Sequence, residues 1–457
     1  MAMSPLLRPL FLIAFALGLV GCNSDAGRAV TVEFWAMGQE GEQVRALLPE
    51  FEHRHPGIRV RVQQIPWSAA HEKLLTAYAG DAMPDAFQLG NTWIPEFVAL
   101  RAIEPLDARL HDWPEAALAD YFPGILATNQ LAGRTYALPW YVDTRLFFYR
   151  TDLLAAAGFP EPPVTWDGWL QAMTALKIPG GGARYAILLP INEWQLPVIL
   201  ALQRGATLLR DRDQYGNFQD PRFRDAFTFY LNLFARGLAP PVSNAQMANL
   251  YQEFASGAFA LYVSGPWNIG EFGRRLPAAL QPHWNTAPLP EFTDSSPFPA
   301  REGLGVRAVG VSLAGGASLA LNRSSPRQEA AWKLLEFLAD PEQQARFYQL
   351  TGDLPARQSA WSDPALVGNR HAQAFREQLQ HLRATPPIPE WERIASRIAY
   401  YAELAIRREM SADEALAALD RDVDRILEKR RWLLSRGLET PLSPPAPLPP
   451  AGEGSER

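Results

Sequence analysis

The first candidates for binding chemistry are an indole and an amide that follow a short apolar run. Residues 258–263 are too few for an ordinary helix and rich in strand-forming types, so they predict a buried strand. A Ser-Gly-Pro turn at 264–266 ends this strand, and Trp267 and Asn268 follow directly. Open α/β sheets bind ligands at the carboxyl ends of their strands, and an indole there can stack on a sugar ring. The alternative is that Trp267 is a core aromatic, and these residues alone leave both readings open.

Matching side chains follow two other predicted strands. Glu40 comes after the strand predicted at 30–35, and Asn91 and Trp93 come after the strand predicted at 85–89. Carboxylates and amides beside indoles suit a polyol, since each hydroxyl both donates and accepts a hydrogen bond. Glu40 also fits the first turn of a helix, where the helix dipole favours an acid. The two roles for Glu40 are compatible.

A long β-type run at 136–150 carries Asp143 and Arg145 in its middle. A charged pair inside a strand is costly if it is buried without partners. The pair is understandable where one strand runs between two domains across a ligand cleft. Glu193 and Trp194 form another polar and aromatic cluster at the end of a predicted strand, 183–189.

A double glycine, Gly315 and Gly316, lies in the apolar run 309–321. Glycine lets the backbone approach a ligand closely, so this pair is a further candidate for the site. It is not a nucleotide-binding loop, because the Gly-x-x-x-x-Gly-Lys spacing is absent.

The elements that must position these residues alternate between strands and helices. Strands at 30–35, 58–64 and 85–89 are separated by a helical pattern at 40–53 and by a second helix that ends at Gly80. This order predicts right-handed crossovers and a parallel, doubly wound α/β sheet.

Composition narrows the class of protein. The 457 residues are 47% hydrophobic and 20% charged, which is typical of a globular chain with room for two or three domains. The net charge of −6 gives no reason to expect binding to nucleic acid. His53 and His55 lack further metal ligands nearby, so neither a metal nor a cofactor is predicted.

The N-terminus predicts export. An apolar run at 10–20 follows Arg8, as in a signal peptide, here residues 1–21. Leu-Val-Gly precedes Cys22 and resembles the lipobox of bacterial lipoproteins, which implies that Cys22 carries a lipid and that 22–29 is a tether. No other apolar run is long enough to cross a bilayer. Residues 438–457 are rich in proline and predict a disordered tail.

In order along the chain, these motifs resemble those of extracellular solute-binding proteins of carbohydrate-uptake ABC transporters, the group that contains maltose/trehalose-binding proteins. The resemblance covers residues 30–434. Besides the lipobox it rests on Val-Glu-Phe-Trp at 32–35, Phe51 with Pro-Gly-Ile-x-Val at 56–60, Met-Pro-Asp at 83–85, Leu-Pro at 138–139 with Asp143 and 146–149, Ser-Gly-Pro-Trp at 264–267, Gly-Gly-Ala-Ser-Leu at 315–319, Ser-Pro at 325–326, and Thr-Gly-x-Leu-Pro-x-Arg at 351–357.

The resemblance implies two doubly wound α/β lobes joined by hinge crossings, the type II periplasmic-binding-protein fold. Lobe one would comprise 28–140 with 291–338, and lobe two 141–290 with 339–437. Binding positions of the family correspond to Glu40, Asn91 or Trp93, Asp143 and Trp267, and also to Glu193, Trp194, Gly315, Gly316 and the region of Trp391. The implied partners are a sugar and ABC permease subunits with their ATPase, bound by a monomer in the periplasm that is held to the membrane by its lipid.

Two alternatives remain from the sequence. A glycerol phosphodiester or another small anion would need arginines in the cleft, for which Arg145 and Arg357 are candidates. A secreted glycoside hydrolase would need two carboxylates about the scissile bond, for example Glu40 and Asp143. The transport motifs favour a binding protein without catalytic residues.

Overall fold

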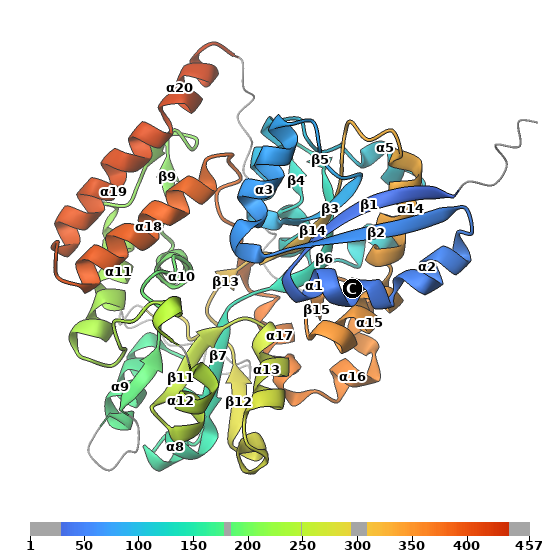
Figure 1. Ribbon diagram of the computed structural model, residues 1–457. Helices are drawn as coiled ribbons and strands as arrows, with labels where there is room; N and C mark the ends of the chain where they lie inside the picture. The colour runs from blue at the N-terminus through green and yellow to red at the C-terminus, as the bar shows by residue number, and fades with distance from the viewer. Residues whose placement is uncertain (1–28, 178–183, 248, 294–308, 438–457) are drawn as a thin grey trace, which may run out of the picture.

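Two β-sheets organise the chain. The computed structural model describes residues 29–177, 184–247, 249–293 and 309–437 (Figure 1). The predicted signal peptide, Cys22 with the tether up to residue 28, and the Pro-rich tail lie outside the described residues. A six-stranded sheet has the order β15-β6-β14-β3-β1-β2, and a four-stranded sheet has the order β12-β7-β11-β8. In those orders the strands are Leu354–Pro355, Ala137–Asp143, Gly315–Leu321, Ala86–Gly90, Val30–Met37 and Ile58–Ile65, and then Trp284–Ala287, Leu146–Arg150, Phe259–Ser264 and Tyr185–Leu188.

The six-stranded sheet begins with the strand and helix order that the sequence predicts. β1 pairs in parallel with β2 and β3, whereas β14 pairs antiparallel with β3 and β6. The helix predicted at 40–53 is interrupted, because Pro49 lacks an N–H and is tolerated only where a new helix starts. The helices next to this sheet are α1 (Gly38–Gln43), α2 (Leu48–Arg54), α3 (Trp67–Ala79), α4 (Ile94–Ala99), α14 (Gln328–Ala339) and α15 (Pro341–Thr351).

The four-stranded sheet supports the other half of the molecule. Its core joins apolar residues of β7, β8 and β11 to a layer of helices that ends with α18 and α19, drawn in red in Figure 1. The helices on this side are α8 (Thr151–Ala156), α9 (Trp166–Leu176), α10 (Gln195–Gln203), α11 (Pro221–Ala235), α12 (Leu250–Ser256), α13 (Trp267–Arg275), α17 (Arg370–Gln378), α18 (Trp391–Ile406), α19 (Ala412–Ile426) and α20 (Glu428–Ser435).

The two sheets are connected by crossings that lie side by side. The run predicted at 136–150 forms two strands, because β6 ends at Asp143 in one sheet and β7 begins at Leu146 in the other. Beside this crossing, β13 (Ser312–Leu313) precedes β14. The buried Ser312 hydroxyl accepts a hydrogen bond from the Arg145 N–H at 3.2 Å and donates to the Arg145 carbonyl at 2.8 Å. These two bonds hold the crossing segments together.

The segment after α14 differs from the predicted lobe boundary. The predicted second lobe includes residues 339–437, but β15 pairs with β6 in the six-stranded sheet. Phe347 of α15 stacks on Trp140 of β6, with ring centroids 4.3 Å apart. Apolar contact with the first sheet therefore extends through residue 355, a feature that sequence order alone did not indicate.

Among the described residues, no helix is both long and apolar enough to cross a membrane.

Candidate functional site

A cavity of about 600 Å³ lies between the two sheets, and segments of both line it. From the side of the first sheet come Gln39, Glu40, Trp67, Asn91, Thr92, Trp93, Tyr141, Gly315, Gly316, Thr351 and Asp353, from the crossing Asp143, Thr144 and Arg145, and from the second side Trp194, Gln195, Trp267, Glu271, Thr385 and Glu392. Three of the strand ends, those of β1, β3 and β11, contribute in the way expected for an α/β sheet.

Glu40 is a buried hydrogen-bond acceptor at the wall of this cavity. The Tyr141 hydroxyl donates to Glu40 Oε1 at 2.8 Å, and the Trp67 indole N–H donates to the same carboxylate at 3.2 Å. Burial raises the pKa of Glu40, while the hydrogen bonds from its own backbone, Tyr141 and Trp67 act in the opposite direction. The carboxylate thus has its donors in place before any ligand arrives.

Asp353 is a second buried carboxyl group that lines the cavity. It follows α15 in the turn of the 351–357 motif and is 6% exposed. Its pKa is held well above the ordinary aspartate value, first by burial and then by the charge of Glu40. Two carboxyl groups of this kind can bond to several hydroxyls of a polyol.

Trp267 is the first residue of α13, and its ring faces the cavity. The Arg145 guanidinium lies over the indole, 4.7 Å from the ring centroid, and Arg145 Nη1 donates to Asp143 Oδ1 at 3.0 Å. Burial raises the pKa of Asp143, and the charge of Arg145 opposes that effect. Gly265 leaves room for the indole, because a Cβ there would lie 1.9 Å from a ring carbon. The alternative that Trp267 is a core aromatic does not agree with its exposure, because the residue is 36% exposed.

The segment after β3 places an amide and an indole together. Asn91 donates to the Ala314 carbonyl at 2.8 Å, which ties the end of β3 to the segment before β14. Trp93 meets Trp67 edge to face, with centroids 5.9 Å apart. Gly90 lies close below Trp93, because a Cβ at that position would be 3.1 Å from its ring, so the ring would have to shift slightly to accept a larger residue.

The double glycine lines the cavity, but its close approach is to protein backbone. A Cβ on Gly315 would lie 2.5 Å from the Asp143 carbonyl oxygen, and one on Gly316 would lie 2.3 Å from that of Tyr141. Gly316 also has φ +149°, a conformation that other residues rarely adopt. The glycines therefore serve the pairing of β14 with β6, a reason that differs from the expected approach to a ligand.

A hydrogen bond between Thr92 and Glu392 joins the two sides at the cavity. Thr92 Oγ1, after β3, donates to Glu392 Oε1 in α18 at 2.6 Å. Burial raises the pKa of Glu392, and the bond from Thr92 opposes this. The bond links the first sheet's strand end to a helix of the second side.

Nine of the twelve predicted ligand-binding residues line the cavity, and Glu193, Asn268 and Trp391 do not. Glu193 accepts a hydrogen bond from Asn244 at 2.9 Å. Asn268 is 2% exposed and donates to Ser264 Oγ at 2.6 Å. Each lies one residue from a lining position.

Trp391 is fully buried behind the site and meets Trp194 edge to face, with centroids 5.4 Å apart. One residue along a helix turns the side chain by about 100°. Glu392 therefore faces the cavity while Trp391 faces the core. The same geometry separates Trp267 from Asn268 on α13.

Trp67, Tyr141, Asp353 and Glu392 are among the lining residues that sequence reasoning missed. Trp67 follows β2 directly, so the strand-end rule applied to β1 and β3 would have found it. Tyr141 and Asp353 have no such local signal, because they are brought to Glu40 by pairing between distant segments.

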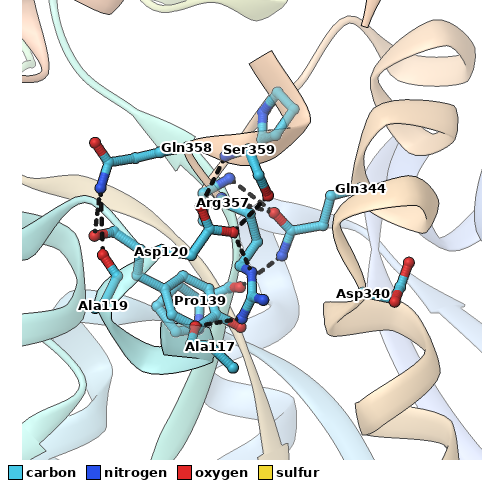
Figure 2. Close-up of polar contacts among 12 residues, drawn as sticks. Ala117, Ala119, Asp120, Pro139, Asp340, Gln344, Arg357, Gln358 and Ser359 are labelled. Carbon is cyan, nitrogen blue, oxygen red and sulfur yellow. Dashed lines mark hydrogen bonds and ion pairs between the residues drawn. The ribbon is translucent and has the colours of Figure 1, made fainter. Parts of the chain in front are cut away.

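Arg357, the arginine considered for an anionic ligand, is held in a network outside the cavity (Figure 2). Its Nε donates to Asp120 at 2.9 Å and its Nη1 donates to the Ala117 carbonyl at 2.7 Å. Gln344 accepts from the Arg357 N–H at 3.0 Å and donates to the Pro139 carbonyl at 3.0 Å. The arginine of the 351–357 motif thus joins α15, β6 and the segment before α7 (Pro123–Ala127).

Comparison with known proteins identifies the family. The family model of bacterial extracellular solute-binding proteins matches residues 36–345. The chain belongs to this family. The structure is similar to that of the sugar-binding protein MalE from Xanthomonas citri, with 46% identity and a TM-score of 0.81 over 89% of this chain and 100% of that one. The predicted family and the predicted α/β fold class are confirmed.

The alignments with two relatives that are named for binding a sugar also cover most of each chain. The chain is 25% identical to the diacetylchitobiose-binding protein DasA of Streptomyces coelicolor over 86% of this chain and 89% of the relative. It is 22% identical to the galactooligosaccharide-binding protein of Bacillus subtilis over 81% of this chain and 83% of the relative. These relatives are named for binding.

Within the described ranges, no group of three or more His, Cys, Asp or Glu residues is placed to hold a metal ion.

Proposed function

We propose that this family member captures a sugar in the cavity between its two sheets and delivers it to the permease subunits of an ABC importer. The observation that carries the proposal is the pairing of Trp267 on one side with Glu40 on the other side of one cavity. An aromatic face and buried acceptors are the two things that a sugar ring with its hydroxyls requires. The volume of about 600 Å³ is within the range of small-molecule sites.

A neutral sugar fits the charges better than an anion does. Five acids line the cavity, Glu40, Asp143, Glu271, Asp353 and Glu392, against the single lining arginine, Arg145. Arg145 already forms an ion pair with Asp143, and Arg357 forms one with Asp120 outside the cavity. An anionic ligand would therefore enter a field of the wrong sign.

We infer binding without cleavage. Of the pair considered for a hydrolase, Asp143 is bonded to Arg145, and Glu40 receives donors from Tyr141 and Trp67. A general acid must carry a proton to donate, whereas the contacts with Arg145, Tyr141 and Trp67 hold these groups as acceptors and oppose the rise in pKa that burial causes. Incubating the protein with maltose and assaying free glucose over hours is the check, and release of glucose at enzymatic rates would contradict this inference.

Export, anchoring and closure complete the proposal. The signal-like run and the Leu-Val-Gly-Cys sequence support a monomer that is exported to the periplasm and tethered by a lipid on Cys22. Cys22→Ser should leave the protein unacylated, and a free Cys22 thiol in the mature wild type would contradict the anchor. The crossings at 143–146 and 313–315 are where we expect the lobes to rotate on binding.

The test of the proposed function is a thermal-shift screen with maltose, trehalose, galactooligosaccharides, diacetylchitobiose and glycerol phosphate, followed by calorimetry. A ligand at 100 times its Kd stabilises the folded state by about 2.7 kcal/mol, which such a screen resolves. We expect at least one neutral sugar to raise Tm and glycerol phosphate to have no effect. A response to glycerol phosphate alone would overturn the choice of ligand class.

A further inference from the structure

A buried glutamine beneath the cavity has a fixed hydrogen-bond direction. Gln88 of β3 is 0% exposed and does not line the cavity. Its Oε1 accepts from the backbone N–H of Met37 at 2.7 Å. A backbone N–H can only donate, so the orientation of the Gln88 amide is fixed by chemistry, with its Nε2 directed at the Tyr141 hydroxyl at 2.9 Å.

This orientation determines where the tyrosine hydrogen points. The Tyr141 oxygen accepts from Gln88, which leaves its own hydrogen for Glu40 Oε1 at 2.8 Å. The Trp67 indole N–H, which is a donor only, adds a bond to the same carboxyl group. Every side chain that bonds to Glu40 within the described residues is therefore a donor, and the carboxyl group is required to accept.

Other groups act against a charged Glu40. Burial disfavours the carboxylate, and the ionisable groups that interact with it are Asp353 and Tyr141, neither of which carries positive charge. No lysine, arginine or histidine in the described part of the chain forms an ion pair with Glu40. The hydrogen bond from the backbone of Glu40, the bond from Tyr141 that Gln88 orients, and the bond from Trp67 oppose the effect of burial, which still raises the pKa of Glu40.

We propose that Gln88 is a positioning residue, which acts through Tyr141 to hold the Glu40 carboxylate as an acceptor for a hydroxyl of the ligand. The proposal rests on the proposed function for the identity of the ligand, but not for the state of Glu40. Gln88 touches neither the cavity nor the ligand. Its contribution is preorganisation, because the acceptor is oriented before binding and the ligand need not order it.

The experiment follows the indole N–H resonance of Trp67 by nitrogen-edited NMR as pH is varied, without any sugar. Trp67→Phe assigns the resonance, and its shift reports ionisation of the bonded Glu40. Tyr141→Phe should move the titration midpoint upward by about one pH unit, because a hydrogen bond to a charged group is lost. Gln88→Met should move it in the same direction by less, because the hydroxyl remains but is no longer oriented.

Two controls separate positioning from damage to the fold. Tyr121 and Gln344 are as deeply buried as Tyr141 and Gln88 and lie outside the cavity, so Tyr121→Phe and Gln344→Met should leave the midpoint unchanged. If Gln88→Met does not fold, Gln88→Asn keeps the amide but is one methylene too short to reach both partners. A midpoint unchanged in the folded Gln88 variant overturns the proposal, even if Tyr141→Phe moves it.

A binding arm uses maltose in calorimetry between pH 4 and pH 8. Affinity should be lost on acidification, and in the Gln88 and Tyr141 variants the loss should begin at a higher pH, again by about one unit for Tyr141→Phe. A purely structural defect would lower affinity equally at all pH values, and that result overturns the proposal. If maltose does not bind at all, its choice as ligand fails while the NMR titration still decides the role of Gln88.

Discussion

Removing the Trp267 indole is the most informative single change in the cavity. The ring begins α13, lies above Gly265, and has the Arg145 guanidinium 4.7 Å from its centroid. It is one of the more exposed large apolar side chains of the described chain, at 36%. Trp267→Ala therefore removes a face that contacts the ligand but little of the packed core.

The magnitudes for affinity and stability differ enough to be separated. Truncating an aromatic anchor in a site commonly costs about 2 kcal/mol of binding free energy, which is about thirtyfold in Kd. A fully buried tryptophan would cost about 3–5 kcal/mol of unfolding free energy. For Trp267 we expect about 2 kcal/mol, because the principal loss is a cation–π contact with Arg145, whose side chain is only 13% exposed.

Calorimetry with the sugar that responds best in the screen measures the affinity, and a thermal melt measures the stability. Trp432 supplies a matched control, since it is 50% exposed and has the Arg436 guanidinium 4.5 Å from its ring centroid, but lies on α20 outside the cavity. Trp432→Ala should leave Kd unchanged. If Trp267→Ala keeps the wild-type affinity while its melting temperature falls steeply, Trp267 is a core residue and the reasoning is refuted.

Two further predictions follow from neighbouring contacts. Gly265→Ala should displace the Trp267 ring, because the new Cβ would lie 1.9 Å from it, and should therefore weaken sugar binding in calorimetry. Gly273→Ala is the control, since a Cβ there meets nothing within 4 Å and should leave the affinity unchanged. Equal affinities of the two variants would contradict the packing of the ring on Gly265. The pKa of Asp353 is raised well above 3.8 in the folded state, so the folded protein holds this proton more tightly than the unfolded chain does. The free energy of unfolding therefore falls as the pH rises above the pKa that Asp353 has in the unfolded chain. Asp353→Asn should therefore raise Tm more at pH 7 than at pH 4, and a gain that is equal at both pH values would show that Asp353 is not the titrating group.

The fold could be predicted from the sequence where local signals were strong. Short runs of strand-forming residues indicated β1, β2 and β3, and the charged pair at 143 and 145 within a β-type run indicated a strand that crosses between domains. Two strands of the second sheet were also predicted from residue types, and the family resemblance implied that they belong to a second lobe. The placement of α15 and β15 was missed, because it depends on the contact of Phe347 with Trp140, about 200 positions away in the sequence.

The site could be predicted in part from local signals. Glu40, Trp93 and Trp267 were found because they follow a predicted strand, Asp143 and Arg145 because they form a charged pair within a β-type run, and Gly315 and Gly316 because they form a double glycine. Trp391 was implied by the family resemblance, which does not say which of two neighbouring side chains faces the cavity, and it is Glu392 that lines it. Sequence position also carries no information on hydrogen-bond direction.

Asp353 and Gln88 could not be predicted from the sequence, for two different reasons. Asp353 reaches the cavity through the pairing of β15 with β6, and the importance of Gln88 arises from the donors around it. Both depend on contacts between segments that are far apart in the chain, and a local pattern contains no trace of them.

A crystal structure of the protein grown with the sugar that gives the largest thermal shift tests the central claim most directly. We predict density for a sugar ring on the face of Trp267, with a hydroxyl of the same molecule within hydrogen-bond distance of the Glu40 carboxylate. Density for the sugar at any other surface, with the cavity between the two sheets holding only water, would contradict it.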